Sequence, residues 1–290
     1  MGRQVAGKIK ENGRKSTVRQ RDTGSTGKWR TERRTNGQGN NVTNQTIVTG
    51  IVLLSAPSGE YDRRVVLLTK ERGKISAFAK GARRPRSALG AAVNPFAFGE
   101  FTIYEGRNSN TLVDAKIQNY FEELRTDIEG AYYGFYFLEL AGYYGREGIQ
   151  EGDMLKLLYQ TLRALLNTRI PNRLVRVIYE LKLICINGEG PQVFQCVSCG
   201  KTEGPFWFSA RQGGILCPHC RTDVMDLRTM DTSTLYTMQY IESSPVEKLY
   251  TFVVKEQVLE ELERIMKRYL EVYIDRNFQS LTILETILEN

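Results

Sequence analysis

Two closely spaced pairs of cysteines are the feature that most constrains how this chain can fold. They are Cys196 and Cys199 in "CVSCG" and Cys217 and Cys220 in "CPHC", with seventeen residues between the pairs. Two residues between cysteines let both thiolates reach one tetrahedral Zn²⁺, and the intervening "PFWFSARQGGI" can form a hairpin that returns the second pair to the first. Four thiolates leave no open coordination position. The sequence therefore predicts one structural zinc per chain, in a ribbon-like module over residues 189–223.

Other interpretations of these residues stay open at the level of sequence. The spacing could arise by chance, or the cysteines could be redox-active. His219 is the only histidine, lies inside the second pair and could replace a neighbouring ligand. Cys185 lies apart in an apolar helical stretch, where core packing is expected rather than a reactive thiol. Five cysteines in 290 residues do not make a disulfide scaffold.

Residues 46–122 have the pattern of a small β-domain. Strand-like runs occur at 47–54, 63–69, 74–80, 96–106 and 111–118. Turns are expected between them, including one over "APSGEYD" (56–62). Five short strands in about 70 residues favour a closed barrel, with the five-stranded OB-fold as the first candidate and an SH3-like barrel as the alternative.

The rest of the chain has helical periodicity on either side of the cysteine module. Helices are predicted over residues 127–144, 153–167, 172–188 and 255–276. The predicted fold is therefore multidomain α+β. An OB-fold domain (46–122) is followed by a helical domain in two parts (123–188 and 224–290), with the zinc module inserted between them.

The positive charge is concentrated at the amino terminus. Residues 1–46 carry eleven Lys or Arg and three acids, a net of +8, whereas the remaining residues have a net charge of −1. Large apolar residues are sparse there and show no helix or strand period. We therefore predict a disordered basic leader over residues 1–45. It lacks the apolar core of a secretory signal.

We expect residues 1–41 to lie outside the working protein, with translation starting at Val42. No methionine lies between Met1 and Met154, and a valine codon can serve as a bacterial start. The alternative is a genuine disordered arm that binds nucleic acid, as basic tails do. The intact mass of the protein from its native cells decides between them, and a species that begins at Met1 would contradict the expectation.

A cluster of cations follows the third predicted strand. "FAKGARRPRS" (78–87) contains Lys80, Arg83, Arg84 and Arg86, and Gly81 and Pro85 exclude a regular helix or central strand there. From residue 72 to residue 99 the chain has no acid and two further cations, which complete a candidate nucleic-acid-binding set: Arg72, Lys74, Lys80, Arg83, Arg84 and Arg86.

The basic loop has two interpretations. It could be a solvated loop that binds nothing. Its position beside a barrel strand favours nucleic-acid binding, because barrels of this type bind single strands across one face. Phosphates would contact the cations, and bases would stack on those flanking aromatic residues that are not buried. The candidates for stacking are Phe78, Phe96, Phe98, Phe101 and Tyr104.

Several classes of function find no support. A single histidine inside a cysteine pair excludes a Ser–His or Cys–His arrangement, and there is no dinucleotide fingerprint. "CGKT" (199–202) is not a P-loop, because Gln195 stands where a glycine is needed. Carboxylate chemistry stays open, but we expect no enzyme. No stretch approaches the roughly 20 apolar residues of a membrane span, so we expect a cytoplasmic protein.

These motifs together resemble the bacterial recombination mediator family RecO. "GIVL" (50–53), "GEYDRR" (59–64), "LTKERGKISAFAKGARRPRS" (68–87) and "NPF" (94–96) resemble the amino-terminal part of that family. "CVSCG", "FSARQGGILC" (208–217) and "CPHC" resemble its zinc-bearing members. Two regions depart from it: the leader, and "RNFQSLTIL" (276–284), which keeps only Arg276 of a basic stretch common in the family.

The resemblance implies an OB-fold, a helical domain with an inserted zinc module, and a non-enzymatic role in recombinational DNA repair. It implies binding of single- and double-stranded DNA, strand annealing at the nucleoid, and help in loading recombinase together with RecR and single-strand-binding protein. It carries over the basic loop as DNA contacts and the four cysteines as zinc ligands. The alternatives are a zinc-ribbon nucleic-acid-modifying enzyme, an RNA-binding accessory protein, and an interaction scaffold.

Overall fold

The structure is a computed structural model that describes residues 44–288. Residues 1–43 of the predicted leader and the proposed start at Val42 lie outside this range, so both stay predictions. The first strand begins at Gln45, one residue before the predicted boundary. Within the described range the chain forms a β-barrel, six α-helices and a small three-stranded sheet.

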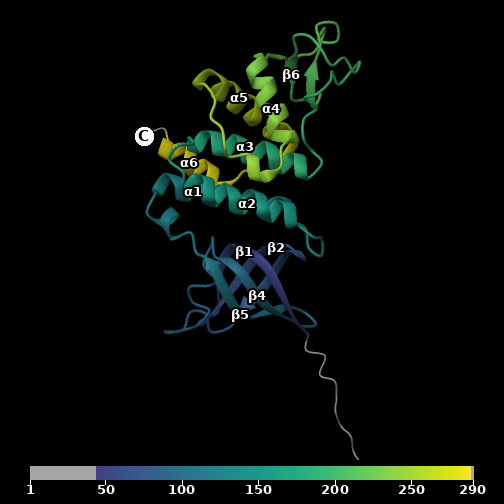
Figure 1. Cartoon of the computed structure of the whole chain (residues 1–290). Coiled ribbons are helices and arrows are strands. Elements are labelled where there is room, and N and C mark those ends of the chain that lie inside the picture. Colours follow the sequence, from purple (N-terminus) through teal and green to yellow (C-terminus); the bar gives the residue numbers. More distant parts are fainter. Residues whose placement is uncertain (1–43, 289–290) are drawn as a thin grey trace, which may run out of the picture. The chain divides into compact units, whose positions relative to one another are not determined.

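The first five strands close into a barrel (Figure 1). Their order around the barrel is β1-β2-β3-β5-β4, and every neighbouring pair is antiparallel except β3 and β5, which pair in parallel over a short stretch. This closure confirms the five-stranded, OB-like barrel expected from the alternating pattern. The strands are β1 (Gln45–Ser58), β2 (Asp62–Thr69), β3 (Gly73–Ala79), β4 (Phe98–Glu105) and β5 (Asn110–Asn119).

Period-two alternation decides which side chains fill the barrel. In β3 Ile75, Ala77 and Ala79 are buried inside it, whereas the even-numbered residues face outward and are partly exposed. The interior side chains form a core separate from that of the helices, in which Val52, Leu67 and Phe101 are fully buried. Part of the outward side packs on the helices, as Ile51, Leu53 and Leu68 do, and the rest can carry other chemistry.

Strand β1 runs farther than the sequence predicted. We expected a turn over residues 56–62, but β1 continues to Ser58, and Pro57 pairs with Arg63 of β2. Beyond Ile51, β1 no longer pairs with β4, so its free edge tolerates a proline. The turn is confined to the three residues before β2 and starts at Gly59, whose φ of 68° suits glycine.

The helices confirm the predicted helical periods at 127–144, 153–167, 172–188 and 255–276. Two further helices, α4 and α6, lie in the region after residue 224 where only a return of helical periodicity was predicted. The helices are α1 (Ile128–Tyr144), α2 (Gly152–Leu165), α3 (Asn172–Ile186), α4 (Thr232–Ser243), α5 (Glu256–Tyr273) and α6 (Gln279–Leu288).

The turn between β2 and β3 packs against the segment that follows α1. Gly73 has a φ of 62°, and a Cβ at this position would lie 2.1 Å from the carbonyl oxygen of Arg146. The backbone N–H of Lys74 donates to that same carbonyl at 2.9 Å, and its ammonium donates to the carbonyl of Gly142 at 2.9 Å. Only glycine permits this close approach of backbones, which joins the barrel to the helices.

A buried carboxylate lies in the helical core. Glu180 of α3 is 1% exposed, and its Oε1 accepts hydrogen bonds from the Tyr136 hydroxyl at 2.7 Å and from Arg176 Nε at 2.8 Å. A buried charge needs both a counter-charge and hydrogen bonds, and this arrangement supplies them. The three side chains therefore depend on one another.

We expect Glu180→Ala to lower the free energy of unfolding by about 3–5 kcal/mol, because it leaves the Arg176 guanidinium buried without its partner. Urea unfolding measures the change. Glu271→Ala is the matched control, since Glu271 pairs with Arg268 at 3.1 Å on an exposed helix face. Such pairs contribute less than about 1 kcal/mol. Equal losses in both variants would contradict the structural role given to Glu180.

The cysteine module is a three-stranded sheet with order β7-β6-β8. The predicted hairpin is present as β6 (Trp207–Ser209) and β7 (Gly214–Leu216). Its third strand, β8 (Arg228–Thr229), pairs with β6 and lies beyond the boundary at residue 223 that the sequence indicated. The sheet thus takes residues from the following segment, a pairing that local sequence does not reveal.

Candidate metal centre and nucleic-acid interface

The four cysteines converge on one point, as their spacing predicted. The sulfur atoms of Cys196, Cys199, Cys217 and Cys220 all lie within 4.8 Å of one another, and those of Cys199 and Cys217 are 3.7 Å apart. Tetrahedral Zn²⁺ with Zn–S bonds of about 2.3 Å places its sulfurs about 3.8 Å apart. The cluster therefore has the donor set and the spacing to hold a metal ion.

Backbone amides point at the sulfurs and favour their ionised form. Cys217 N–H donates to the sulfur of Cys196 at 3.4 Å. Burial raises the pKa of Cys196, but the amides of Cys217, Cys199 and Ser198 outweigh it and lower the pKa to about 6. At Cys220 a hydrogen bond with Ser198 lowers the pKa, while burial and the other three cysteines raise it to about 12. A divalent cation would relieve the repulsion among the thiolates.

The other candidates near this centre lie outside it. His219 is exposed and does not belong to the sulfur cluster. Cys185 packs against the helical core, and burial raises its pKa to about 12, which is the behaviour of a packing residue rather than a reactive thiol.

The module is tied to the helices by its backbone and by one aromatic contact. The Tyr269 hydroxyl of α5 donates to the carbonyl of Glu189 at 2.7 Å, and Gln239 Nε2 of α4 donates to the carbonyl of Val193 at 2.7 Å. The Phe208 ring lies 6.0 Å from that of Tyr269. Because these groups share one core, folding of the module and packing of α4 and α5 are coupled.

The basic loop is an ordered turn anchored on the β1–β2 hairpin. Gly81 N–H donates to Asp62 Oδ1 at 2.7 Å, and Arg83 N–H donates to the carbonyl of Tyr61 at 2.9 Å. Ala82 is buried, which fixes the centre of the loop against the barrel. The sequence analysis missed these anchors, since Asp62 and Tyr61 lie about 20 residues earlier in the chain.

The cations of this loop face solvent. Lys80, Arg83, Arg84 and Arg86 are all exposed, and among the described residues none forms an ion pair. Arg83 Nη1 donates to the Gly59 carbonyl at 3.0 Å, and the Arg84 guanidinium lies 5.1 Å from the centre of the Tyr61 ring. The loop therefore presents four positive charges that carboxylates do not neutralise.

The two remaining cations of the predicted set have partners within the protein. Arg72 forms an ion pair with Glu105 of β4, and the Lys74 ammonium is bound by the Gly142 carbonyl. The hydrogen bond from Arg72 lowers the pKa of Glu105. The four cations of the loop are exposed and form no ion pair among the described residues, whereas Arg72 and Lys74 are partly buried and connect the barrel strands to other parts of the fold.

The five aromatic candidates also separate into two groups. Phe101 is in the barrel interior, Phe96 packs on Phe135 of α1 with ring centres 4.9 Å apart, and Phe98 packs on Tyr159 of α2 at 4.5 Å. Phe78 is half-buried, and Tyr104 is 45% exposed. These last two are the rings that neither fill the barrel interior nor stack on another ring.

Arg276, the one cation of the "RNFQSLTIL" stretch, has partners inside the chain. It lies 3.6 Å from Glu139 of α1, and its guanidinium is 5.6 Å from the centre of the Phe278 ring. It therefore helps to hold the segment before α6 against α1.

Two family models together match most of the chain. The family model described as "Recombination protein O N terminal" matches residues 44–121, and "Recombination protein O C terminal" matches residues 125–282. The chain belongs to the RecO family. The first RecO match coincides with the barrel and its basic loop, and the second includes α1 to α5, the cysteine module and the start of α6.

Individual RecO relatives resemble the chain over most of their own length. A DNA repair protein RecO from Alkaliphilus metalliredigens is 34% identical over 82% of this chain and 98% of its own. Those from Acetivibrio thermocellus and Symbiobacterium thermophilum are 31% and 30% identical, and cover 82% and 83% of this chain and 95% and 96% of their own lengths.

Among the residues that the structure describes, none of the helices has the length and apolarity that crossing a bilayer requires.

Proposed function

We propose that this chain is a DNA-binding recombination mediator that binds and anneals single-stranded DNA during DNA repair. The observation that carries the proposal is the basic loop: Lys80, Arg83, Arg84 and Arg86 extend from the barrel of a RecO-family chain without a carboxylate partner among the described residues. Phosphates supply the missing negative charge, and binding releases the counterions around them.

This role needs no reacting group in the protein. Cations that bind phosphates can hold two complementary strands close together, and base pairing then supplies the free energy of annealing. We therefore propose a non-enzymatic function, supported by a sequence with a single, exposed histidine and no nucleotide-binding motif. The RecO resemblance supports RecR and single-strand-binding protein as partners in loading recombinase, with the nucleoid of the bacterial cytoplasm as the place of action.

We propose zinc as the ion of the cysteine cluster, one per chain. Four thiolates with amide donors suit this ion, and a closed site of four cysteines is structural, not catalytic. When bound, the zinc would hold the two Cys-x2-Cys turns together. It would also supply folding energy that a sheet of three short strands cannot supply by itself.

The test is fluorescence anisotropy with labelled single strands and duplexes, in buffer without nucleotide. We expect the full chain to bind both, with affinity that falls steeply as salt rises. Absence of binding at low salt would overturn the proposal. Covalent change of the oligonucleotide would instead support the second candidate, a zinc-ribbon nucleic-acid-modifying enzyme, and preference for RNA would support an accessory role.

A further inference from the structure

A row of outward side chains crosses all five strands of the barrel at one level. Strand register pairs Arg64 of β2 with Phe78 of β3, Phe78 with Thr111 of β5, Thr111 with Tyr104 of β4, and Tyr104 with Gln45 of β1. Directly paired residues project from the same face of a sheet. These five side chains therefore lie side by side on the outer wall, and we call them the barrel row.

The two rings of the barrel row have no aromatic partner in the described part of the chain. Phe78 belongs to neither hydrophobic core, although its neighbours Ala77 and Ala79 are fully buried. Tyr104 is 45% exposed, while the adjacent Ile103 fills the barrel. Large aromatic side chains stabilise a fold mainly through burial, which Phe78 has only in part and Tyr104 largely lacks.

The spacing of the rings suits a ligand with several flat groups. Phe78 and Tyr104 are separated by one strand, and neighbouring strands lie about 4.7–4.9 Å apart, so the rings stand roughly 9–10 Å from each other. Thr111 between them is small. Each ring can therefore stack a separate base without the other blocking it.

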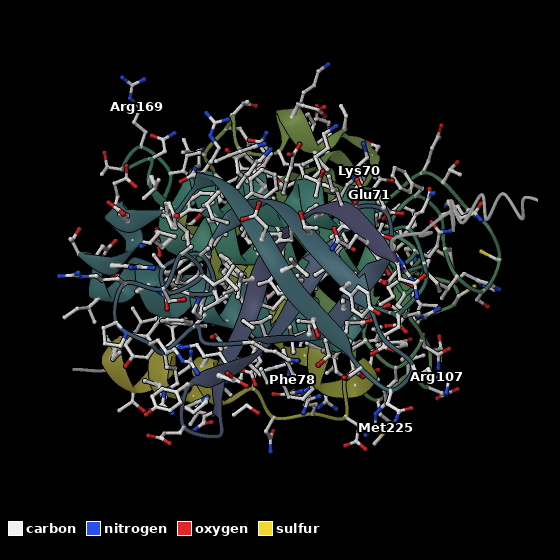
Figure 2. The ribbon with its side chains drawn as sticks, turned by 90° about the horizontal axis from the view of Figure 1, so that it is seen from below. Lys70, Glu71, Phe78, Arg107, Arg169 and Met225 are labelled. Carbon is white, nitrogen blue, oxygen red and sulfur yellow. The ribbon has the colours of Figure 1, made fainter. Side chains whose placement is uncertain are left out.

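Three exposed cations lie near the rings of the barrel row. Arg64 is exposed, and its Nε donates to Ser76 Oγ at 3.0 Å, which holds the guanidinium beside Phe78. Lys80 follows Phe78 by two residues, and Arg107 is exposed on the β4–β5 turn. Figure 2 labels Phe78 and Arg107 in the lower part of the view, and it labels Lys70 and Glu71 of the β2–β3 turn in the upper part.

A groove beside Phe78 adds polar groups. It has a volume of about 380 Å³, and Asn108, Ser109 and Asn110 line it together with Phe78 and Arg64. Carboxylates also lie near this surface: Glu147 lines the groove, Glu105 is paired with Arg72, and Asp114 is exposed on β5. Amides and a hydroxyl in such a place can donate hydrogen bonds to base edges or accept them.

We propose that Phe78 and Tyr104 stack the bases of a single-stranded nucleic acid that crosses the barrel row, while the basic loop binds its phosphates. This inference rests on the proposed function and adds a selectivity to it. Bases of a single strand are free to stack on protein rings, whereas those of a duplex are stacked on one another. The two rings of the barrel row therefore favour single strands, whereas the basic loop binds the phosphates of single strands and duplexes alike.

The test compares affinities for a labelled single strand and a labelled duplex at one salt concentration. Base–aromatic stacking contributes about 1–3 kcal/mol per base, and about 1.4 kcal/mol is tenfold. We expect Phe78→Ala and Tyr104→Ala each to weaken single-strand binding about tenfold, and to leave duplex binding and the salt dependence unchanged. Phe78→Tyr should bind as the wild type does, whereas Phe78→Leu should lose most of that affinity.

Ile47→Ala is the matched control, because Ile47 is an exposed apolar side chain on the same wall, 65% exposed, but is not a ring. It should bind single strands normally. Two results would overturn the stacking inference but not the proposed function. One is an equal loss of affinity for single strand and duplex in the ring variants. The other is unchanged single-strand affinity in a folded Phe78→Ala/Tyr104→Ala double variant. If the wild-type chain binds neither ligand, the proposed function fails as well, so the two failures are distinguishable.

Discussion

Replacing Cys199 with serine is expected to remove the metal from the protein and to unfold the module around β6, β7 and β8. Three remaining thiolates no longer close the tetrahedral site, and in small modules metal binding supplies folding energy. Because the module shares its core with α4 and α5, the free energy of unfolding of the helical domain should also fall, by more than about 4 kcal/mol. Elemental analysis and limited proteolysis measure the two effects.

The wild-type protein should contain about one zinc per chain and resist cleavage between residues 189 and 229. Cys185→Ser is the matched control, since it makes the same substitution outside the sulfur cluster and should keep the zinc. A metal-free wild-type protein whose module is intact and protease-resistant would contradict the metal site. If the Cys199→Ser variant unfolds as expected and also loses DNA binding, that loss follows from unfolding of the module rather than from a lost contact with DNA.

Reversing the charge of Arg83 and Arg84 to glutamate is expected to weaken binding to all DNA sequences alike. Phosphate contacts position a nucleic acid but carry no sequence information. The plot of log affinity against log salt has a negative slope. Losing two phosphate contacts should make this slope shallower by roughly 1.4 on single strands, at about 0.7 per contact. A salt titration by fluorescence anisotropy gives both quantities, the affinity and the slope.

The matched control reverses two exposed arginines of the helical domain, Arg163 and Arg169, and so makes the same change in net charge. That variant should lose much less affinity and keep its slope, because neither residue lies on the barrel. An unchanged slope and affinity in the folded Arg83/Arg84 variant would mean that the basic loop is a solvated surface.

Strand and ligand patterns in this chain are local, which is why they could be predicted. Alternation in "KISAFAK" specifies which residues of β3 enter the barrel, and a Cys-x2-Cys knuckle needs only its own turn. The predicted end of β1 was wrong because a proline near a glycine signals a turn in most contexts. Here a free strand edge accommodates it.

Partners that are far apart in the sequence could not be foreseen. Arg72 and Glu105 are separated by 33 residues, and Asp62 and Gly81 by 19. Alternation also cannot tell a stacking ring from an interface ring: Phe78 and Phe98 are both half-buried, but only Phe98 packs on a helix. The difference depends on where α2 lies, which is a property of the tertiary fold.

The most direct test of the account is annealing of complementary strands that are coated with single-strand-binding protein, without nucleotide. The wild-type chain should accelerate the appearance of duplex, and the Arg83→Glu/Arg84→Glu variant should not, while the Arg163/Arg169 control behaves as the wild type does. No acceleration by the wild-type chain, or equal acceleration by the basic-loop variant, would contradict the central claim that this loop makes the protein a DNA-annealing mediator.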